Sequence, residues 1–151
     1  MRMDDSCWPL VIATMPQKVG LDSLHTLEQF YERCFARRER FASVTDTTAL
    51  RSLPDAVWRK RLADWLNAPA FRERNRLYNV GSATILTWAP VRATLTAIQW
   101  LWEPPSPQYY ASDMRSAVDW CVERLQAEKV PVSFRLADLH ASLRKRVASA
   151  Q

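Results

Sequence analysis

Glycine is scarce in this sequence, and its scarcity excludes whole classes of function. The chain of 151 residues contains only two glycines, Gly20 and Gly81, against nine prolines. A phosphate-binding P-loop and a dinucleotide-binding fingerprint each need several closely spaced glycines, because only glycine lets the backbone approach the phosphates. Neither motif can be built here, so the usual nucleotide enzymes that rely on these loops are excluded.

Metal-ligating residues are also sparse. The three cysteines, Cys7, Cys34 and Cys121, lie far apart in the sequence, and the only histidines are His25 and His140. No pair of them has the spacing of a metal site. Cys34 and Cys121 fall on apolar helical faces, where a buried thiol packs as a small hydrophobe. We therefore expect no metal, no cofactor and no catalytic residue of these two types.

Long apolar runs are absent too. No segment reaches the roughly 20 apolar residues that a membrane span requires. The N-terminal run WPLVIATMP is too short and too closely bounded by proline for a signal peptide. The sequence therefore predicts a cytoplasmic, reduced protein without a membrane span. Hydrophobic residues make up 48% and charged residues 25% of the chain, as in an ordinary globular protein with a buried core.

Basic residues outnumber acidic ones, and the formal net charge of the chain is +5. The densest basic region lies between residues 51 and 76, where the only acids are Asp55, Asp64 and Glu73. Most such faces are merely solvated, yet this excess favours an acidic protein partner. Nucleic acid is not expected, because no DNA-reading module is present and the tryptophans fall on core-facing stripes. The cations that we assign to partner contact are Arg51, Arg59, Lys60 and Arg61.

Strand and helix signals alternate along the chain. Short apolar runs bounded by proline or polar residues predict strands near 9–14, 41–46, 82–87 and 108–111. Helical spacing of apolar residues predicts helices that begin near Asp22, Pro54, Pro90 and Ser112. In the last of these helices, the residues expected to point inward are Ala117, Val118, Cys121, Val122 and Leu125. Units of this length imply an α/β fold with a mainly parallel sheet of four to five strands and about four to five helices. The strand 82–87 is expected at the centre, because it reads as apolar on both faces.

The segment 129–151 differs from the rest. Pro131 separates it, and Leu136, Leu139, Leu143 and Val147 form one amphipathic stripe. We expect an α/β domain over residues 1–128, followed by a C-terminal amphipathic helix or tail over 129–151. This segment either docks on the sheet, which is the more common arrangement, or binds a partner.

Part of the chain resembles a known family. In WAPVRATLTAIQWLWEPPSPQYYASDMRSAVDWCVERL, a strand and a polar turn precede a helix that opens Pro-Val-Arg. A short strand then leads to a helix that begins with an acidic residue and carries Ala117 near its first turn. This order resembles the second half of a STAS domain, the domain of bacterial anti-sigma-factor antagonists and of anion-transporter tails. Asp46 followed by the Trp-containing basic helix RKRLADWL is similar to uncharacterised bacterial STAS-like proteins.

The resemblance spans roughly residues 8 to 128, and it implies a domain that binds partner proteins, or in some cases nucleotides, without catalysis. In the antagonist group, the strand that matches FASVTD ends in an Asp-Ser-Ser/Thr-Gly-like motif whose hydroxyl is phosphorylated by a partner kinase. Here Asp46 is followed by Thr47 and Thr48, while Ala49 replaces the glycine. By this resemblance the two threonines are candidate phosphoacceptors of a switch.

The residues themselves leave other interpretations of Asp46, Thr47 and Thr48 open. Open α/β sheets bind ligands at the carboxyl ends of their strands, so the cluster can contact a ligand. It can also do no more than satisfy backbone N–H groups in a turn, which is the more common role of such residues. Catalysis is the weakest interpretation, because neither a histidine nor a second fixed acid lies nearby in the sequence.

Trp102 is a further candidate for interaction. Trp100 and Trp102 cannot both face inward on one helix, because positions two apart diverge by about 200°. We predict that Trp102, beside the turn EPPSP, is the exposed one. An exposed tryptophan with apolar neighbours can anchor an interface.

Together these observations predict a non-enzymatic protein-interaction module in bacterial signalling or assembly, switched by phosphorylation. The alternative is a small-ligand-binding domain that takes an anionic nucleotide or lipid headgroup near Asp46, Thr47 and Trp88. An enzyme that uses Asp46 comes third. The identity of the partner and the formation of a homo-oligomer are left open by the sequence.

Overall fold

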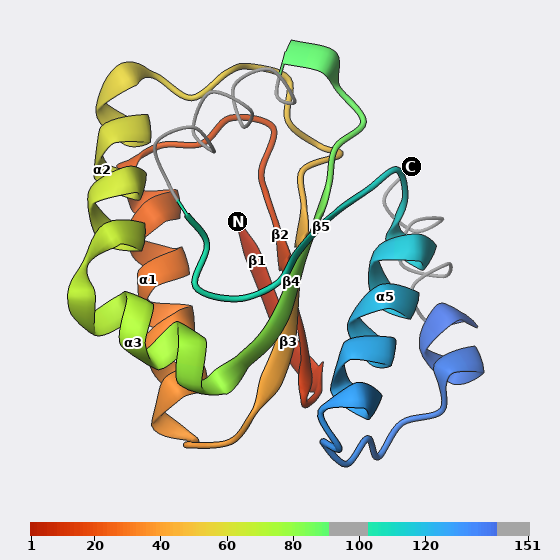
Figure 1. Ribbon diagram of the computed structural model, residues 1–151. Helices are drawn as coiled ribbons and strands as arrows, with labels where there is room; N and C mark the ends of the chain where they lie inside the picture. The colour runs from red at the N-terminus through yellow and green to blue at the C-terminus, as the bar shows by residue number, and fades with distance from the viewer. Residues whose placement is uncertain (91–102, 142–151) are drawn as a thin grey trace.

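The chain forms a five-stranded sheet with helices on both faces (Figure 1). The computed structural model describes residues 1–90 and 103–141. The strands are β1 Arg2–Cys7, β2 Leu10–Thr14, β3 Phe41–Asp46, β4 Asn79–Ile85 and β5 Gln108–Ala111. They follow one another across the sheet in chain order, β1-β2-β3-β4-β5. The β1–β2 pair is antiparallel, and the other three pairs are parallel. The predicted α/β class with a mainly parallel sheet is confirmed.

The strands differ from the prediction in two places. The first strand was missed, because its sequence RMDDSC is polar, and a polar strand is tolerated at the edge of a sheet. The second difference concerns the strand predicted at 82–87, which in the structure is β4 and spans Asn79–Ile85. It is not the central strand of the sheet, because that position belongs to β3. It is also not apolar on both faces, since Ser82 and Thr84 alternate with Ala83 and Ile85.

The helices cover the sheet in two groups, with α1, α2 and α3 on one face and α5 on the other (Figure 1). They are α1 Leu21–Ala36, α2 Ala56–Asn67, α3 Pro69–Tyr78 and α5 Met114–Ala127. A further short helical segment spans residues 136–141 on the α5 side. The structure describes only the first residues of the helix predicted from Pro90, since residues 89 and 90 are helical and residues 91–102 lie outside the described part of the chain.

Two helices begin later than predicted, and an aspartate explains each shift. The Asp55 carboxylate accepts a hydrogen bond from the backbone N–H of Trp58 at 2.8 Å, so α2 begins at Ala56 and not at Pro54. In the same way, Asp113 accepts from the N–H of Ser116 at 2.8 Å and caps α5 in place of Ser112. Aspartate is among the strongest N-cap residues, because its oxygen satisfies a free N–H of the first turn.

The α5 face of the sheet is closely packed. The five residues of α5 that we predicted to point inward are all buried: Ala117, Val118, Cys121, Val122 and Leu125. Gly81 lets the helix approach, because a Cβ at this position would lie 2.9 Å from the ring of Trp120. That ring stacks on Tyr109 with a centroid separation of 5.4 Å.

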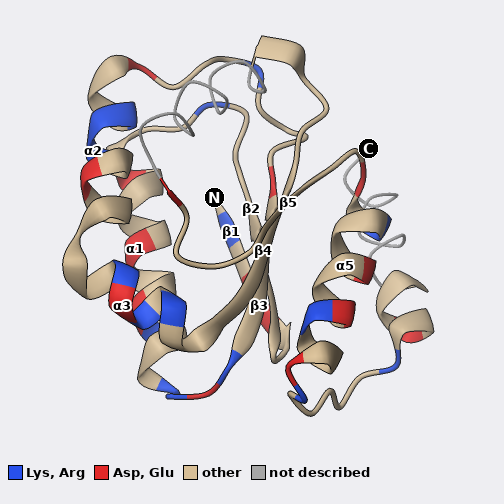
Figure 2. Ribbon diagram, in the orientation of Figure 1, with Lys and Arg blue, Asp and Glu red and all other residues tan. Residues whose placement is uncertain are grey.

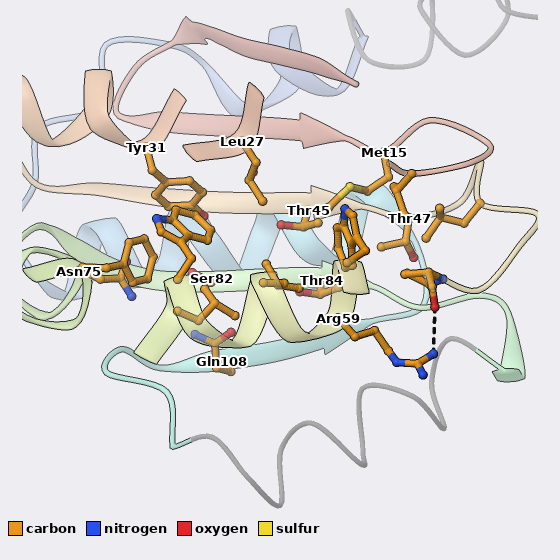
Figure 3. Close-up of a pocket in the computed structure, with 18 of the residues that line it drawn as sticks. Met15, Leu27, Tyr31, Thr45, Thr47, Arg59, Asn75, Ser82, Thr84 and Gln108 are labelled. Carbon is orange, nitrogen blue, oxygen red and sulfur yellow. Dashed lines mark hydrogen bonds between the residues drawn. The ribbon is translucent and has the colours of Figure 1, made fainter. Parts of the chain in front are cut away.

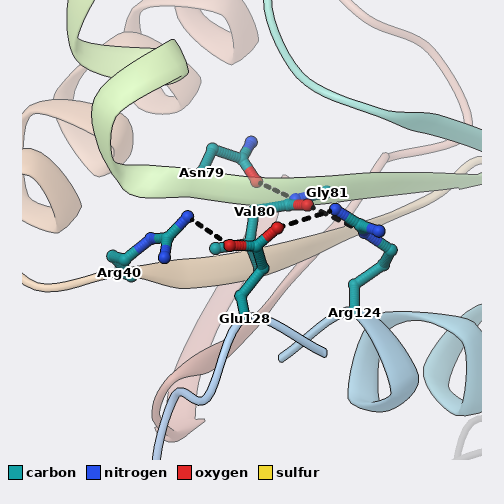
Figure 4. Close-up of polar contacts among 6 residues, drawn as sticks. All are labelled: Arg40, Asn79, Val80, Gly81, Arg124 and Glu128. Atoms are coloured by element: carbon teal, nitrogen blue, oxygen red, sulfur yellow. Dashed lines mark hydrogen bonds and ion pairs between the residues drawn. The ribbon is translucent and has the colours of Figure 1, made fainter. Parts of the chain in front are cut away.

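Polar contacts fix the C-terminal end of α5 to the starts of two strands (Figure 4). Arg124 Nε donates to the carbonyl of Val80 at 3.2 Å, and its Nη2 pairs with Glu128 at 3.2 Å. Glu128 also pairs with Arg40 at 2.8 Å, just before β3. The helix is therefore held at one end by charges and along its length by apolar contact.

The described part of the C-terminal segment packs against the same layer. Val130, Val132, Phe134 and Leu136 are partly buried on the α5 core, and Leu139 is only 4% exposed. His140 Nε2 lies 2.7 Å from a carboxylate oxygen of Asp119 on α5. Residues 130–141 therefore contact the α5 layer and do not extend away from it. The other two members of the predicted stripe, Leu143 and Val147, lie outside the described residues.

Candidate functional site

The loop after β3 carries the Asp46-Thr47-Thr48 cluster, and Asp46 closes a turn there. Its Oδ1 accepts from the backbone N–H of Thr48 at 2.9 Å and from the Thr48 hydroxyl at 2.7 Å. Its carbonyl accepts from the N–H of Met15 at 2.8 Å, which joins the ends of β2 and β3. Such an aspartate bonded to the backbone two residues on is a common turn device, so both carboxylate and carbonyl have a structural role.

The two threonines have different environments. Thr47 is 7% exposed, and its hydroxyl donates to the carbonyl of Ile85 at 2.5 Å, at the end of β4. Thr48 is exposed. Of the two predicted phosphoacceptors, only Thr48 presents its hydroxyl at the surface of the folded chain, whereas Thr47 connects two strand ends.

Arg51 lies beside Thr48. Its Nη1 donates to the carbonyls of Thr48 and Leu50 at 2.8 and 3.0 Å, and its own N–H donates to the carbonyl of Gln17 at 2.9 Å. The next helix, α2, begins only at Ala56. The positive group near the Thr48 hydroxyl is therefore the Arg51 side chain and not a helix N-terminus.

The other predicted contact residues do not form one uniform face. Lys60 and Arg61 are exposed on α2, where Lys60 pairs with Asp64 at 2.7 Å. Arg59 is half-buried and donates to the carbonyl of Pro54 at 2.8 Å. Figure 2 shows that Lys and Arg lie among Asp and Glu along α2 and α3. The predicted contact at Trp102 lies outside the described residues.

A cavity of about 180 Å³ lies between the sheet and helices α1, α2 and α3 (Figure 3). Sequence reasoning missed it, although the polar residues of β4 that alternate with apolar ones were a signal for it. The sheet contributes polar side chains to its lining: Thr45, Ser82, Thr84, Gln108 and Tyr110. The helices contribute mainly apolar ones, among them Leu27, Trp58, Leu62, Trp65 and Phe71.

Strand register explains the polar wall of the cavity. Thr45 lies opposite Thr84, and Thr84 opposite Tyr110, so these three residues form a row across β3, β4 and β5. Ser82 and Gln108 lie opposite each other in a second row, two residues earlier along β4 and β5. Parallel strands buried on both faces are normally apolar, so two polar rows under three helices are an exception that calls for a reason.

Part of this polar wall is internally bonded. Tyr31 donates to Ser43 at 3.2 Å, Ser43 and Ser82 share a hydrogen bond of 2.9 Å, and Asn79 donates to Ser82 at 2.8 Å. Asn79 Nδ2 also donates to Asn75 Oδ1 at 2.9 Å. Burial raises the pKa of Tyr31 to about 12, so its hydroxyl stays protonated. The network rigidifies the end of the cavity near the start of β4.

One buried group in the lining of the cavity is left unpaired in the described part of the chain. Trp58 is 5% exposed, and its buried Nε1 has no hydrogen-bond partner among residues 1–90 and 103–141. Arg59 is the one Lys, Arg, Asp or Glu among the described lining residues. Neither Asp46 nor Trp88 is among the described residues that line the cavity. An anionic ligand near these two residues and Thr47 stays a prediction.

Thiol and metal chemistry finds no support in the described residues. Burial raises the pKa of Cys34 to about 11 and that of Cys121 to about 12, so both thiols are protonated at neutral pH. Across residues 1–90 and 103–141, no three His, Cys, Asp or Glu side chains cluster as metal ligands would. Within the same residues, no helix has the length and apolar character needed to cross a membrane.

Comparisons with protein-family models, with curated proteins and with solved structures each found no match. The fold and the geometry of the loop and cavity therefore carry the functional argument.

Proposed function

We propose that this chain is a STAS-like protein-interaction domain of bacterial signalling, which binds its partner at the carboxyl end of the sheet and catalyses no reaction. The mostly parallel five-stranded α/β sheet agrees with this family resemblance. The observation that carries the proposal is the exposed Thr48 hydroxyl, held by Asp46 and flanked by Arg51. This edge is also where open α/β sheets place their binding sites.

Phosphorylation of Thr48 would change this edge strongly. The Thr48 hydroxyl now donates to the Asp46 carboxylate, and a phosphate cannot donate in this way when fully ionised. The phosphate would instead place roughly two negative charges next to that carboxylate, while the Arg51 side chain offers a neighbouring positive charge. The turn that Asp46 closes would have to rearrange, so the modification would act as a switch on partner binding.

The exposed cations give the partner its expected chemistry. Arg51, Lys60 and Arg61 are exposed, and Arg61 has no ion pair in the part of the chain that the structure describes. Exposed cations add little to folding stability, but they speed the association of an acidic partner in a salt-dependent way. We therefore expect an acidic protein surface to meet this edge.

The test begins with capture of the partner from the native cell and its identification by mass spectrometry. Thr48→Glu should weaken the measured affinity for this partner at least tenfold, while its circular dichroism shows that the chain remains folded at the assay temperature. Gln126→Glu, which adds the same charge at an exposed position of α5, is the matched control and should bind like the original chain. Equal affinity of Thr48→Glu and Gln126→Glu would show that the Thr48 edge is not the interface.

The role of the cations is tested separately. Reversal of charge at Lys60 and Arg61 should slow association at low salt, and the difference should shrink as salt rises, because screening acts beyond about 8–10 Å. Association rates that stay unchanged at low salt would remove these two residues from the interface.

A further inference from the structure

The cavity between the sheet and helices α1–α3 has no part in the proposed partner binding. We propose that it binds a small, uncharged, amphipathic molecule about one ring in size that carries hydroxyl or carbonyl oxygen. This inference does not depend on the proposed function, because it rests on different side chains.

The size of the cavity fits such a molecule. The cavity measures about 180 Å³ and is partly open to solvent, so a small molecule can reach it. An apolar cavity of about 150 Å³ is sufficient for benzene. The space therefore suits one ring with a small substituent.

One wall of the cavity is apolar and would hold the ring. Leu27 of α1, Leu62 and Trp65 of α2 and Phe71 of α3 all line it. Trp65 and Phe71 pack together with a centroid separation of 4.4 Å. Burial of apolar surface against such side chains is the main source of affinity for a ligand of this kind.

The other wall supplies hydrogen-bonding groups without partners. The hydroxyls of Thr45 and Thr84, adjacent across β3 and β4, have no hydrogen bond within residues 1–90 and 103–141. Figure 3 shows both side chains directed toward the cavity. From the helix side of the cavity, the Nε1 of Trp58 on α2 adds a group that can only donate and that is unpaired in the described chain. Of these groups, only Trp58 Nε1 is fully buried without a partner in that part of the chain. An unpaired buried donor is costly, and a ligand oxygen that accepts from it would remove this cost.

The charges around the cavity argue for an uncharged ligand. No acid or lysine is found among its described lining residues, and the single cation, Arg59, already donates to the carbonyl of Pro54. Figure 3 shows the Arg59 guanidinium turned away from Thr84. A carboxylate or phosphate that entered beside Thr84 would lose its hydration without a charged partner.

The experiment uses the full chain labelled with ¹⁵N and follows the indole N–H signals by NMR. The probes are phenol, benzene and benzoate, which share a ring and differ in polarity and charge. The Trp58 signal is identified as the one that disappears in Trp58→Phe. Phenol should shift this signal in a saturable way, benzene should bind at least fivefold more weakly, and benzoate at the same concentration should leave the signal in place.

Two variants and a control locate the binding. Thr84→Val keeps the shape of the side chain but removes the hydroxyl, so it should weaken phenol about five- to tenfold and leave benzene unchanged. Leu62→Phe should fill the cavity and abolish binding of both. Thr26→Val on α1, whose hydroxyl donates to the carbonyl of Asp22, should change neither.

Each opposite result overturns part of the inference. If no probe moves the Trp58 signal, water fills the cavity and the proposal is wrong. If benzoate binds as well as phenol, the ligand class is wrong. If Thr84→Val binds phenol like the original chain, the polar wall does not recognise the ligand. Binding of phenol together with an unaffected partner interaction in Thr48→Glu would separate this proposal from the proposed function.

Discussion

The two faces of the sheet are built in opposite ways. On the α5 face, one continuous apolar cluster joins β2, β3, β4 and β5 to the helix, and most of its members are completely buried. On the α1–α3 face, the buried residues divide into two clusters, with polar rows and a cavity between sheet and helices. The comparison teaches that the continuous apolar core and the polar-lined cavity lie on opposite faces of the same sheet.

A single strand shows how the sequence creates this difference. In β4, Gly81, Ala83 and Ile85 are buried residues of one set, while Ser82 and Thr84 alternate with them. Because side chains alternate between the faces of a strand, the first set faces α5 and the second faces the cavity. The closed face accepts helix α5 at close range, whereas the open face leaves polar atoms to be satisfied.

The largest expected effect comes from a deletion in the closed face. Leu125→Ala removes a completely buried side chain of α5 and should lower the free energy of unfolding by about 2–5 kcal/mol. The matched change in the open face, Leu62→Ala, affects a half-buried residue beside the cavity and should cost less than half as much. Urea unfolding of both variants measures this, and equal losses would contradict the contrast between the faces.

The next effect tests how closely α5 approaches the sheet. In Gly81→Ala the new Cβ would lie 2.9 Å from the Trp120 ring, and the displaced ring should lower the unfolding free energy by about 1–3 kcal/mol. At Gly20 a new Cβ meets nothing within 4 Å, so Gly20→Ala should cost clearly less. If thermal unfolding places both variants at the same melting temperature, the packing of Trp120 is looser than described.

The helix caps should respond equally on both faces, because their hydrogen bonds are local. Asp113→Ala at α5 and Asp55→Ala at α2 should each cost about 1 kcal/mol. Hydrogen bonds from the Ser116 backbone and from Ser112 lower the pKa of Asp113 from its ordinary 3.8. Its contribution is therefore present above pH 3.8 and is lost as the pH falls through the lowered pKa, so the difference between Asp113→Ala and the original chain should shrink progressively in more acidic solution.

The smallest effect concerns the unpaired hydroxyl of the open face. Thr84→Val should change the free energy of unfolding by no more than about 0.5 kcal/mol, because that hydroxyl has no partner in the described chain to lose. Thr47→Val makes the same chemical change but breaks the hydrogen bond to Ile85, and it should cost about 1–2 kcal/mol. Chemical denaturation compares the two, and a larger loss for Thr84→Val would mean that its hydroxyl is bonded.

Much of the fold could be predicted from the sequence, because periodicity is a local property. Three strands were placed within a residue or two of their bounds, as at Phe41–Asp46, and every inward position named for α5 was right. The edge strand Arg2–Cys7 has no apolar alternation that would reveal it. The starts of α2 and α5 lie two residues later than predicted, because several polar residues near each start can cap the helix. Only the structure shows that Asp55 and Asp113 accept the hydrogen bonds from the first turns.

The candidate site was harder to predict, because it depends on how distant strands align. The sequence singled out Asp46, Thr47 and Thr48, but it could not distinguish the buried threonine from the exposed one. That difference arises from the hydrogen bond of Thr47 to Ile85, 38 positions away. The cavity depends on Thr45 lying opposite Thr84, a register that no local pattern encodes.

The loop that follows β3 has one further consequence, since its residues alternate between two environments. Thr47 and Leu50 line the cavity, whereas Thr48 and Arg51 are exposed at the edge proposed for the partner. A molecule inside and a protein outside would thus share one short stretch of backbone. Thermodynamic linkage then makes any influence reciprocal: by whatever factor the inner molecule alters affinity for the outer protein, the outer protein alters affinity for the inner molecule.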